Sequence, residues 1–244
     1  IKDFLKNNGI DEIFSFVYGL ETHKMKSEKF KKVLVVTEEI FSMDGDTAPI
    51  ADLQKICAEF DATLMVDGAH SLYDGNAKPD IYVGTMSKAL GSYGGYVCGS
   101  KTFIEYIKSS ARSLIYSTAL PPSAVASAIA ALDVIEAERS YLKTLGNMNF
   151  FISSLRAQRG NPDWIAASAT PPRNDGVSAI VPIILGSEAA AIAAEKYLYE
   201  NGILASAIRP PTVPNGTARL RISVSASHAK EELEKLANLL KKIL

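Results

Sequence analysis

The chain has few of the residues that build metal sites and disulfide frameworks. Its 244 residues include two cysteines, Cys57 and Cys98, and three histidines, and neither type falls at a ligand spacing. Both cysteines lie in apolar segments, so we expect two small buried side chains. The sequence therefore predicts neither a bound metal nor a disulfide.

An excess of charge of one sign and long apolar runs are also lacking. The 26 basic and 27 acidic residues give a formal net charge of −1, which offers no electrostatic basis for binding nucleic acid or an anionic membrane. No apolar run approaches the roughly 20 residues that span a bilayer, and the N-terminus has no signal-peptide pattern. We expect a protein of a reducing, cytoplasmic compartment.

The first half of the sequence alternates apolar runs with a helical pattern. Continuous apolar and β-branched runs predict strands at 33–37, 63–67, 81–85 and 95–99, and apolar residues at helical spacing predict a helix at 49–60. Strands that alternate with helices form mostly parallel sheets, in which ligands collect beyond the carboxyl ends of the strands. We therefore expect the chemistry of this α/β protein at that edge of its sheet.

The second half is typical of a smaller α+β unit. An alanine-rich pattern predicts one long helix from about 121 to 143. Further patterns predict strands at 178–185, 203–208 and 218–224, helices at 188–201 and 228–244, and loops at 161–162 and 171–176. The predicted divisions are an N-terminal segment at 1–32, a large cofactor-binding domain at 33–140 and a small C-terminal domain at 141–244.

Two residues at the ends of predicted strands indicate pyridoxal phosphate chemistry. Lys88 lies in a turn of small residues at 85–91, where a lysine can form an imine, although alone it would be interpreted as a surface residue. Asp67 closes the strand 63–67, and a carboxylate there can keep a pyridine nitrogen protonated. His70 could donate to the cofactor, although a lone histidine is more often structural. The lysine and the aspartate are the pair that pyridoxal phosphate enzymes supply.

Several polar residues near predicted strand and helix ends admit two interpretations. Glu38 and Ser42 follow the strand 33–37, in a segment whose Asp and Gly content is typical of a turn. Ser117 and Thr118 precede a pair of prolines, so they fit a helix N-cap, but their hydroxyls could equally reach a phosphate.

Two arginines bracket a proline-rich segment near the end of the chain. Arg209 and Arg221 suit bidentate recognition of a carboxylate, although pairing at the surface is the usual fate of arginine.

Five segments occur in an order that resembles one enzyme family. They are TEEIFSMDGD, LMVDGAH, GTMSKALGSYGGYV, ARSLIYSTALPP and AIRPPTVPNGTARLRIS. Together they resemble the α-oxoamine synthases, fold-type I pyridoxal-phosphate enzymes that condense an amino acid with an acyl thioester. The likeness runs from about residue 33 to the end of the chain. It implies a mostly parallel sheet of the aminotransferase kind, a smaller C-terminal α+β domain, pyridoxal 5'-phosphate as cofactor, and a homodimer with a shared active site.

The resemblance implies a cofactor role for five matching residues. Lys88 would bind pyridoxal phosphate as an imine and later remove the Cα proton of the substrate. Asp67 would pair with the pyridine nitrogen, and His70 would bond the phenolic oxygen. Ser42 and Thr85 would belong to the cofactor pocket.

The resemblance extends to residues around that pocket. Glu38 would lie beside the cofactor, and Ser117 and Thr118 would reach the phosphate held by a neighbouring subunit. Arg221 would bind the carboxylate of the amino acid, with Arg209 as a second candidate for substrate contact.

Within the family, the segments LIYSTALPP and IRPPTVP favour the branch that uses L-alanine and a pimeloyl thioester of coenzyme A or a carrier protein in biotin biosynthesis. Glycine-using relatives, such as 5-aminolevulinate synthase or glycine C-acetyltransferase, are the alternative, because a small pocket rejects one methyl group only weakly. A catalytically silent chain that only dimerises is an alternative from another class.

The sequence departs from the family pattern in three places. Gly68 stands where the family usually has an acidic residue, and the loop 71–80 is shorter than the family's. The N-terminal part of the family fold is apparently missing before residue 33, so that 1–32 would be a remnant. We expect the hydrogen bonding near the cofactor ring to differ from the family's because of Gly68.

Overall fold

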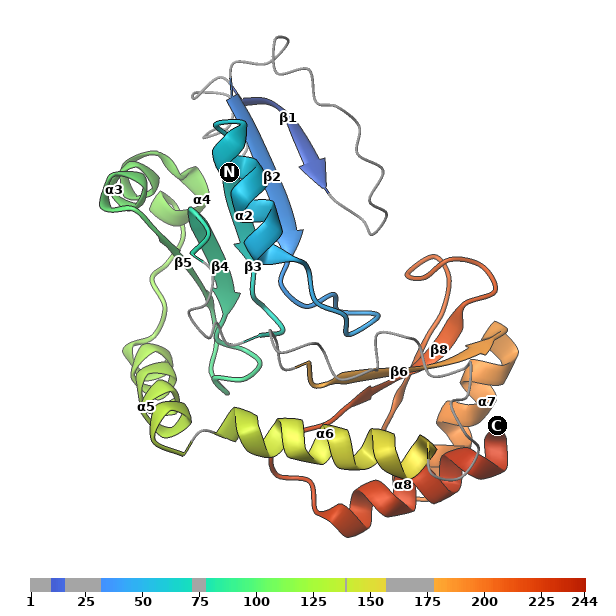
Figure 1. Ribbon diagram of the computed structural model, residues 1–244. Helices are drawn as coiled ribbons and strands as arrows, with labels where there is room; N and C mark the ends of the chain where they lie inside the picture. Colours follow the sequence, from blue (N-terminus) through green and yellow to red (C-terminus); the bar gives the residue numbers. More distant parts are fainter. Residues whose placement is uncertain (1–9, 16–31, 72–77, 139, 157–177) are drawn as a thin grey trace. The chain divides into compact units, whose positions relative to one another are not determined.

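A computed structural model describes residues 10–15, 32–71, 78–138, 140–156 and 178–244 (Figure 1). The predictions for the loops at 161–162 and 171–176, and for much of 1–32 and 71–80, fall outside the described residues. The chain divides into two compact units. The first consists of Ile1–Glu39 and Ala48–Leu132, and the second consists of Ile40–Thr47 and Asp133–Leu244.

The first unit contains a five-stranded sheet in the order β1-β2-β3-β4-β5. Its strands are β1 (Ile10–Ser15), β2 (Lys32–Glu38), β3 (Thr63–Asp67), β4 (Ile81–Thr85) and β5 (Gly95–Gly99). The first four strands are parallel, and β5 runs antiparallel to β4 at the edge of the sheet. The mostly parallel sheet and its four predicted strands are confirmed, whereas β1 was not predicted.

Both faces of this sheet carry apolar side chains, because successive residues of a strand point to opposite sides. Helix α2 (Ile50–Glu59) contributes to the cluster on one face, and α3 (Lys101–Ser110), which was not predicted, contributes Phe103 to the other. The two clusters are Val33, Val35, Cys57, Leu64, Val66 and Tyr82, and Leu34, Met65 and Ile81. Burial on both faces explains why these strands are continuous apolar runs rather than alternating ones.

The two cysteines differ in exposure. Cys57 is the buried residue of α2, as expected, and burial together with the Asp80 charge raises the pKa of its thiol. Cys98 is exposed, so the prediction that it is buried was wrong. Cys98 lies on the edge strand β5, four of whose five residues are exposed.

After β5 and α3 the chain forms α4 (Arg112–Ile115), α5 (Pro122–Glu138) and α6 (Ser140–Arg156). The prediction of one helix over about 121–143 was therefore wrong, because α5 ends at Glu138 and a second helix, α6, runs from Ser140 to Arg156. Ala128 is buried in α5, while Phe151 and Ile152 of α6 are among the most buried residues of the chain. Among the described residues, no helix is long and apolar enough to cross a membrane.

The second unit packs helices on a three-stranded antiparallel sheet in the order β6-β8-β7. Its further elements are β6 (Ile180–Gly186), α7 (Glu188–Glu200), β7 (Ser206–Ile208), β8 (Ala218–Ser223) and α8 (Lys230–Ile243). One apolar cluster joins the sheet to α6, α7 and α8, and it includes Phe151, Ile183, Leu198, Leu220 and Leu240. The leucine face predicted for the C-terminal helix is thus confirmed as a packing face.

The strand predicted at 203–208 is shorter than expected. It begins only at Ser206, because the backbone N–H of Ile203 donates to the carbonyl of Leu198 at 2.9 Å and so completes the end of α7. Gly202, with φ of +77°, makes that turn possible without a side-chain clash.

Candidate active site

The predicted lysine and histidine come together at one edge of the first unit's sheet. Lys88 follows β4 and His70 follows β3, and the Lys88 Nζ lies 2.9 Å from the His70 Nε2. The turn that carries Lys88 is closed by its own backbone, since Gly91 N–H donates to the Lys88 carbonyl at 3.0 Å. An exposed amine beside an imidazole can accept an aldehyde and exchange a proton with its neighbour.

Three other predicted residues lie at the carboxyl ends of neighbouring strands. Glu38 is opposite Asp67 in the parallel register of β2 and β3, so both side chains emerge on one face of the sheet. Asp67 is opposite Val83 of β4, which places Thr85, two residues later, on that same face. The convergence expected from the sequence is therefore present within this unit.

Backbone contacts fix the Asp67 carboxylate. Its Oδ1 accepts a hydrogen bond from the Ala69 N–H at 2.9 Å, and its carbonyl accepts one from the Glu39 N–H at 2.8 Å. The Gly68 N–H donates to the carbonyl of Val83 at 2.8 Å. The segment between Asp67 and His70 is thus held on both sides by β2 and β4.

The hydroxyl of Thr85 organises the lysine turn. It lies 2.8 Å from the Ser87 hydroxyl oxygen, donates to the Gly94 carbonyl at 3.2 Å and accepts from the Ser87 N–H at 3.2 Å. Thr85 therefore holds the first residues of the turn that presents Lys88.

Ser117 and Thr118 lie in the exposed connection between α4 and α5. The Ser117 hydroxyl donates to the carbonyl of Ser113. The N-cap interpretation was wrong, because α5 begins only at Pro122. An exposed position keeps both hydroxyls available to a group outside this unit.

The remaining predicted residues belong to the second unit. Ser42 lies in the segment 40–47, and Arg209 is exposed just after β7. Arg221 lies on β8, opposite Pro182 of β6, and its Nε is buried without a hydrogen-bond partner among the described residues. A buried, unsatisfied guanidinium nitrogen is costly, so this position favours an anion that arrives with the ligand.

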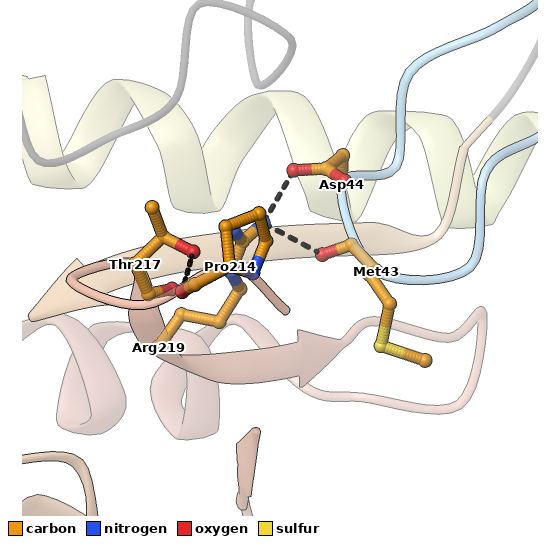
Figure 2. A network of polar contacts seen from close by, with 5 residues as sticks. All are labelled: Met43, Asp44, Pro214, Thr217 and Arg219. Atoms are coloured by element: carbon orange, nitrogen blue, oxygen red, sulfur yellow. Dashed lines mark hydrogen bonds and ion pairs between the residues drawn. The ribbon is translucent and has the colours of Figure 1, made fainter. Parts of the chain in front are cut away.

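Sequence reasoning missed Arg219, which fixes the segment 40–47 to the second unit (Figure 2). Only 4% of Arg219 is exposed, and its guanidinium donates to the Asp44 carboxylate, to the Met43 carbonyl at 3.4 Å and to the Thr217 carbonyl at 3.0 Å. The signal was in the sequence, since two arginines spaced by two in a strand share a face, and Arg219 precedes Arg221 by two.

Sequence reasoning also missed Tyr82 and Glu39. The Tyr82 hydroxyl donates to the Glu39 carboxylate at 3.0 Å, and only 8% of Tyr82 is exposed. Burial first, and then the adjacent Glu39 charge, raise the pKa of Tyr82 far above its usual range. The raised pKa keeps the Tyr82 hydroxyl protonated in the folded protein at neutral pH, so that it can donate this hydrogen bond.

The raised pKa of Tyr82 predicts a loss of stability in alkali. Because the folded pKa exceeds the unfolded value near 10, its contribution is complete below about pH 10 and is lost as pH rises further. Each such group lowers the free energy of unfolding by up to about 1.4 kcal/mol per pH unit in that range. Urea unfolding between about pH 8 and about pH 11 should show this decline, and Tyr82→Phe should make it shallower.

The decline should not vanish in Tyr82→Phe, because burial also raises the pKa values of Tyr96 and Cys57. Tyr199→Phe is the matched control, since the Tyr199 side chain is mostly exposed. Equal alkaline slopes in Tyr82→Phe and the unmodified protein would contradict the prediction.

Known proteins resemble this chain over most of its length. A sequence model of aminotransferase class I and II matches residues 17–240. The chain belongs to the aminotransferase class I and II family. The match spans both compact units.

Curated members of the family carry one recurring name. The chain is 44% identical to the 8-amino-7-oxononanoate synthase of Methylobacterium nodulans over 87% of this chain and 53% of that protein. It is 39% identical to the 8-amino-7-oxononanoate synthase of Beijerinckia indica over 96% of this chain and 58% of that protein. The chain thus spans somewhat more than half the length of these relatives.

Solved structures of family members share the fold. The serine palmitoyltransferase of Sphingomonas wittichii superposes with a TM-score of 0.77 at 26% identity, over 90% of this chain and 56% of that one. The 8-amino-7-oxononanoate synthase of Francisella tularensis gives a TM-score of 0.66 at 25% identity, over 88% and 64%. A structure of SPT with PLP gives 0.74 at 27% identity, over 86% and 54%. The fold-type I architecture expected from the five sequence segments is confirmed.

Proposed function

We propose that the protein binds pyridoxal 5'-phosphate through Lys88 and condenses L-alanine with a pimeloyl thioester to give 8-amino-7-oxononanoate. The reaction forms one carbon–carbon bond and releases carbon dioxide and the free thiol. The observation that carries the proposal is the contact between Lys88 and His70 beside Asp67, at the carboxyl ends of β3 and β4. The names of the relatives with about 40% identity supply the product of the proposal, and the family resemblance of the sequence segments supplies its substrates.

The residues at this sheet edge fit the cofactor. Lys88 offers an exposed amine for an aldehyde, and the anchored carboxylate of Asp67 can hold a cationic ring nitrogen. When bound, pyridoxal phosphate supplies an electron sink for the substrate carbon. His70 lies 2.9 Å from the Lys88 nitrogen, where it can hold or return a proton of that nitrogen. Thr85 orients the turn that presents the amine.

The second unit supplies candidates for substrate recognition. The buried Nε of Arg221 lacks a hydrogen-bond partner in the described part of the chain, and a guanidinium pairs well with the carboxylate of an amino acid. Arg209 is exposed and is a second candidate, while Ser42 lies in the segment that Arg219 holds in place. Glu38 lies beside Asp67 in the first unit and would adjoin the cofactor.

We also propose that two copies of the chain associate. Large apolar side chains of α4 and α5 are exposed, namely Leu114, Ile115, Val125, Ile129 and Leu132. Such a surface is unusual on a monomer and favours an interface. Ser117 and Thr118 lie between these helices, where they would approach the phosphate bound by the partner copy.

Thiol release tests the proposal directly. The purified protein with pyridoxal phosphate and pimeloyl-coenzyme A should release free thiol when L-alanine is added, and much less with glycine. The cofactor alone should produce a new visible absorption band. Faster thiol release with glycine would favour the glycine-using relatives, and no band together with no thiol release would overturn the proposal.

A further inference from the structure

Gly68 lies directly beneath the hydroxyl group of Tyr82. A Cβ atom at position 68 would be 1.7 Å from the Tyr82 hydroxyl oxygen, a distance that no real pair of atoms tolerates. The place next to Asp67, where the sequence lacks the family's acidic side chain, is therefore filled by a phenol from β4. Tyr82 cannot move away easily, because only 8% of it is exposed and it packs with Val66 and Leu64.

The Tyr82 hydroxyl belongs to a chain of hydrogen bonds at the end of β3. It donates to the Glu39 carboxylate at 3.0 Å, and the Glu39 N–H donates to the Asp67 carbonyl at 2.8 Å. The Ser71 N–H donates to the Gly68 carbonyl at 3.0 Å, so the peptide beneath the phenol is held at both ends. Glu39 thus links Tyr82 of β4 to Asp67, whose carboxylate is the candidate partner of the cofactor ring.

The hydrogen bonds of Tyr82 and Glu39 lie on the opposite face of the sheet from the side chains of Asp67 and Glu38. Tyr82 packs with Val33 and Val35 of β2, whereas Asp67 is opposite Glu38, on the other face. Tyr82 therefore lies on the face of the sheet opposite the Asp67 side chain. From that face it packs against the turn between Asp67 and His70.

We propose that Tyr82 and Glu39 are positioning residues that hold Asp67 and His70 in the geometry that binds pyridoxal phosphate, with Gly68 as the residue that admits the phenol. The inference rests on the proposed function, because it concerns the same cofactor. A phenol hydrogen-bonded to the Glu39 carboxylate thus occupies the place beside Asp67 where the family has an acidic side chain.

The test combines cofactor binding with hydrogen exchange. Tyr82→Phe removes the hydroxyl and keeps the ring, and it should weaken pyridoxal phosphate binding about tenfold, as expected for one lost hydrogen bond to a charged group. It should also raise amide hydrogen exchange in the segment 67–71 without cofactor. Glu39→Ala should behave like Tyr82→Phe, and Glu39→Gln, which keeps an acceptor, should restore most of the affinity. The matched control is Tyr96→Phe, from the neighbouring strand, which should change neither measurement.

The possible outcomes separate this inference from the proposed function. If the unmodified protein gives the visible band but Tyr82→Phe binds the cofactor as Tyr96→Phe does, the positioning inference is wrong and the proposed function stands. If Tyr82→Phe lowers the melting temperature while affinity and absorption maximum stay unchanged, Tyr82 is only structural and the inference is wrong. If the unmodified protein gives no band, the proposed function fails, and the role of Tyr82 toward the cofactor fails with it.

Discussion

Replacing Lys88 by alanine should abolish the visible absorption band that the protein gives with pyridoxal phosphate, and it should lower thiol release at least about 10³-fold. Lys88 is the amine 2.9 Å from the His70 ring, and in the proposed function it attaches the cofactor and moves the substrate proton, so the variant should lose both. General-base catalysis alone contributes roughly 10²- to 10⁴-fold, and loss of cofactor anchoring adds to it. Absorption spectra and thiol release, measured on the same preparations, check both parts.

Two variants make this result specific. Lys88→Arg keeps the positive charge next to His70 but cannot form an imine, and it should be as inactive as Lys88→Ala. Lys101→Ala removes an exposed lysine at the start of α3 and should leave both measurements unchanged. Thiol release by Lys88→Ala at the unmodified rate would contradict the assignment. A band that persists in both Lys88 variants would place the imine on another lysine.

The sequence predicted the parts of the site that follow from strand ends. Apolar runs located β2, β3 and β4, and because parallel strands end at one edge, Asp67, Thr85 and Lys88 could be placed together before the structure was known. The contact between Lys88 and His70 needed only two neighbouring strands and one short turn after each. Local patterns suffice for such a site.

Contacts between segments far apart in the chain could not be predicted in this way. Arg219 and Asp44 are 175 residues apart, and no local pattern reveals that an arginine of β8 holds the turn after β2. The contact of Tyr82 with Gly68 also escaped notice, because a glycine after an aspartate is typical of any turn. Only the packed structure shows that the Tyr82 phenol occupies the space where a side chain at position 68 would lie.

Replacing Asp44 by alanine should lower the free energy of unfolding by about 2 kcal/mol, less than the loss of one partner of a fully buried pair, because 47% of the Asp44 side chain is exposed and solvent screens the pair. Arg219 is almost fully buried and donates to the Asp44 carboxylate, so the variant leaves a buried guanidinium with two backbone carbonyls and no anion. The segment 40–47 also packs closely against β6 at Gly45, since a Cβ atom there would lie 2.3 Å from the Ile180 carbonyl oxygen. The segment should therefore loosen rather than detach, and urea unfolding followed by circular dichroism measures the loss.

The double variant Asp44→Ala with Arg219→Met decides whether the loss is due to an unpaired charge. Arg219 is buried whereas Asp44 is half exposed, and an apolar side chain in place of the arginine removes the cost of an unpaired buried charge, so the double variant should be more stable than Asp44→Ala alone. Glu200→Ala is the matched control in the same unit, because the Glu200–Lys196 pair is exposed and should be worth less than about 1 kcal/mol. If Asp44→Ala lowers the free energy of unfolding no more than Glu200→Ala does, the ion pair of Arg219 with Asp44 does not stabilise the fold. If the double variant is less stable than Asp44→Ala, the methionine cannot replace the contacts of Arg219 with Met43 and Thr217, and those contacts rather than the charge hold the segment.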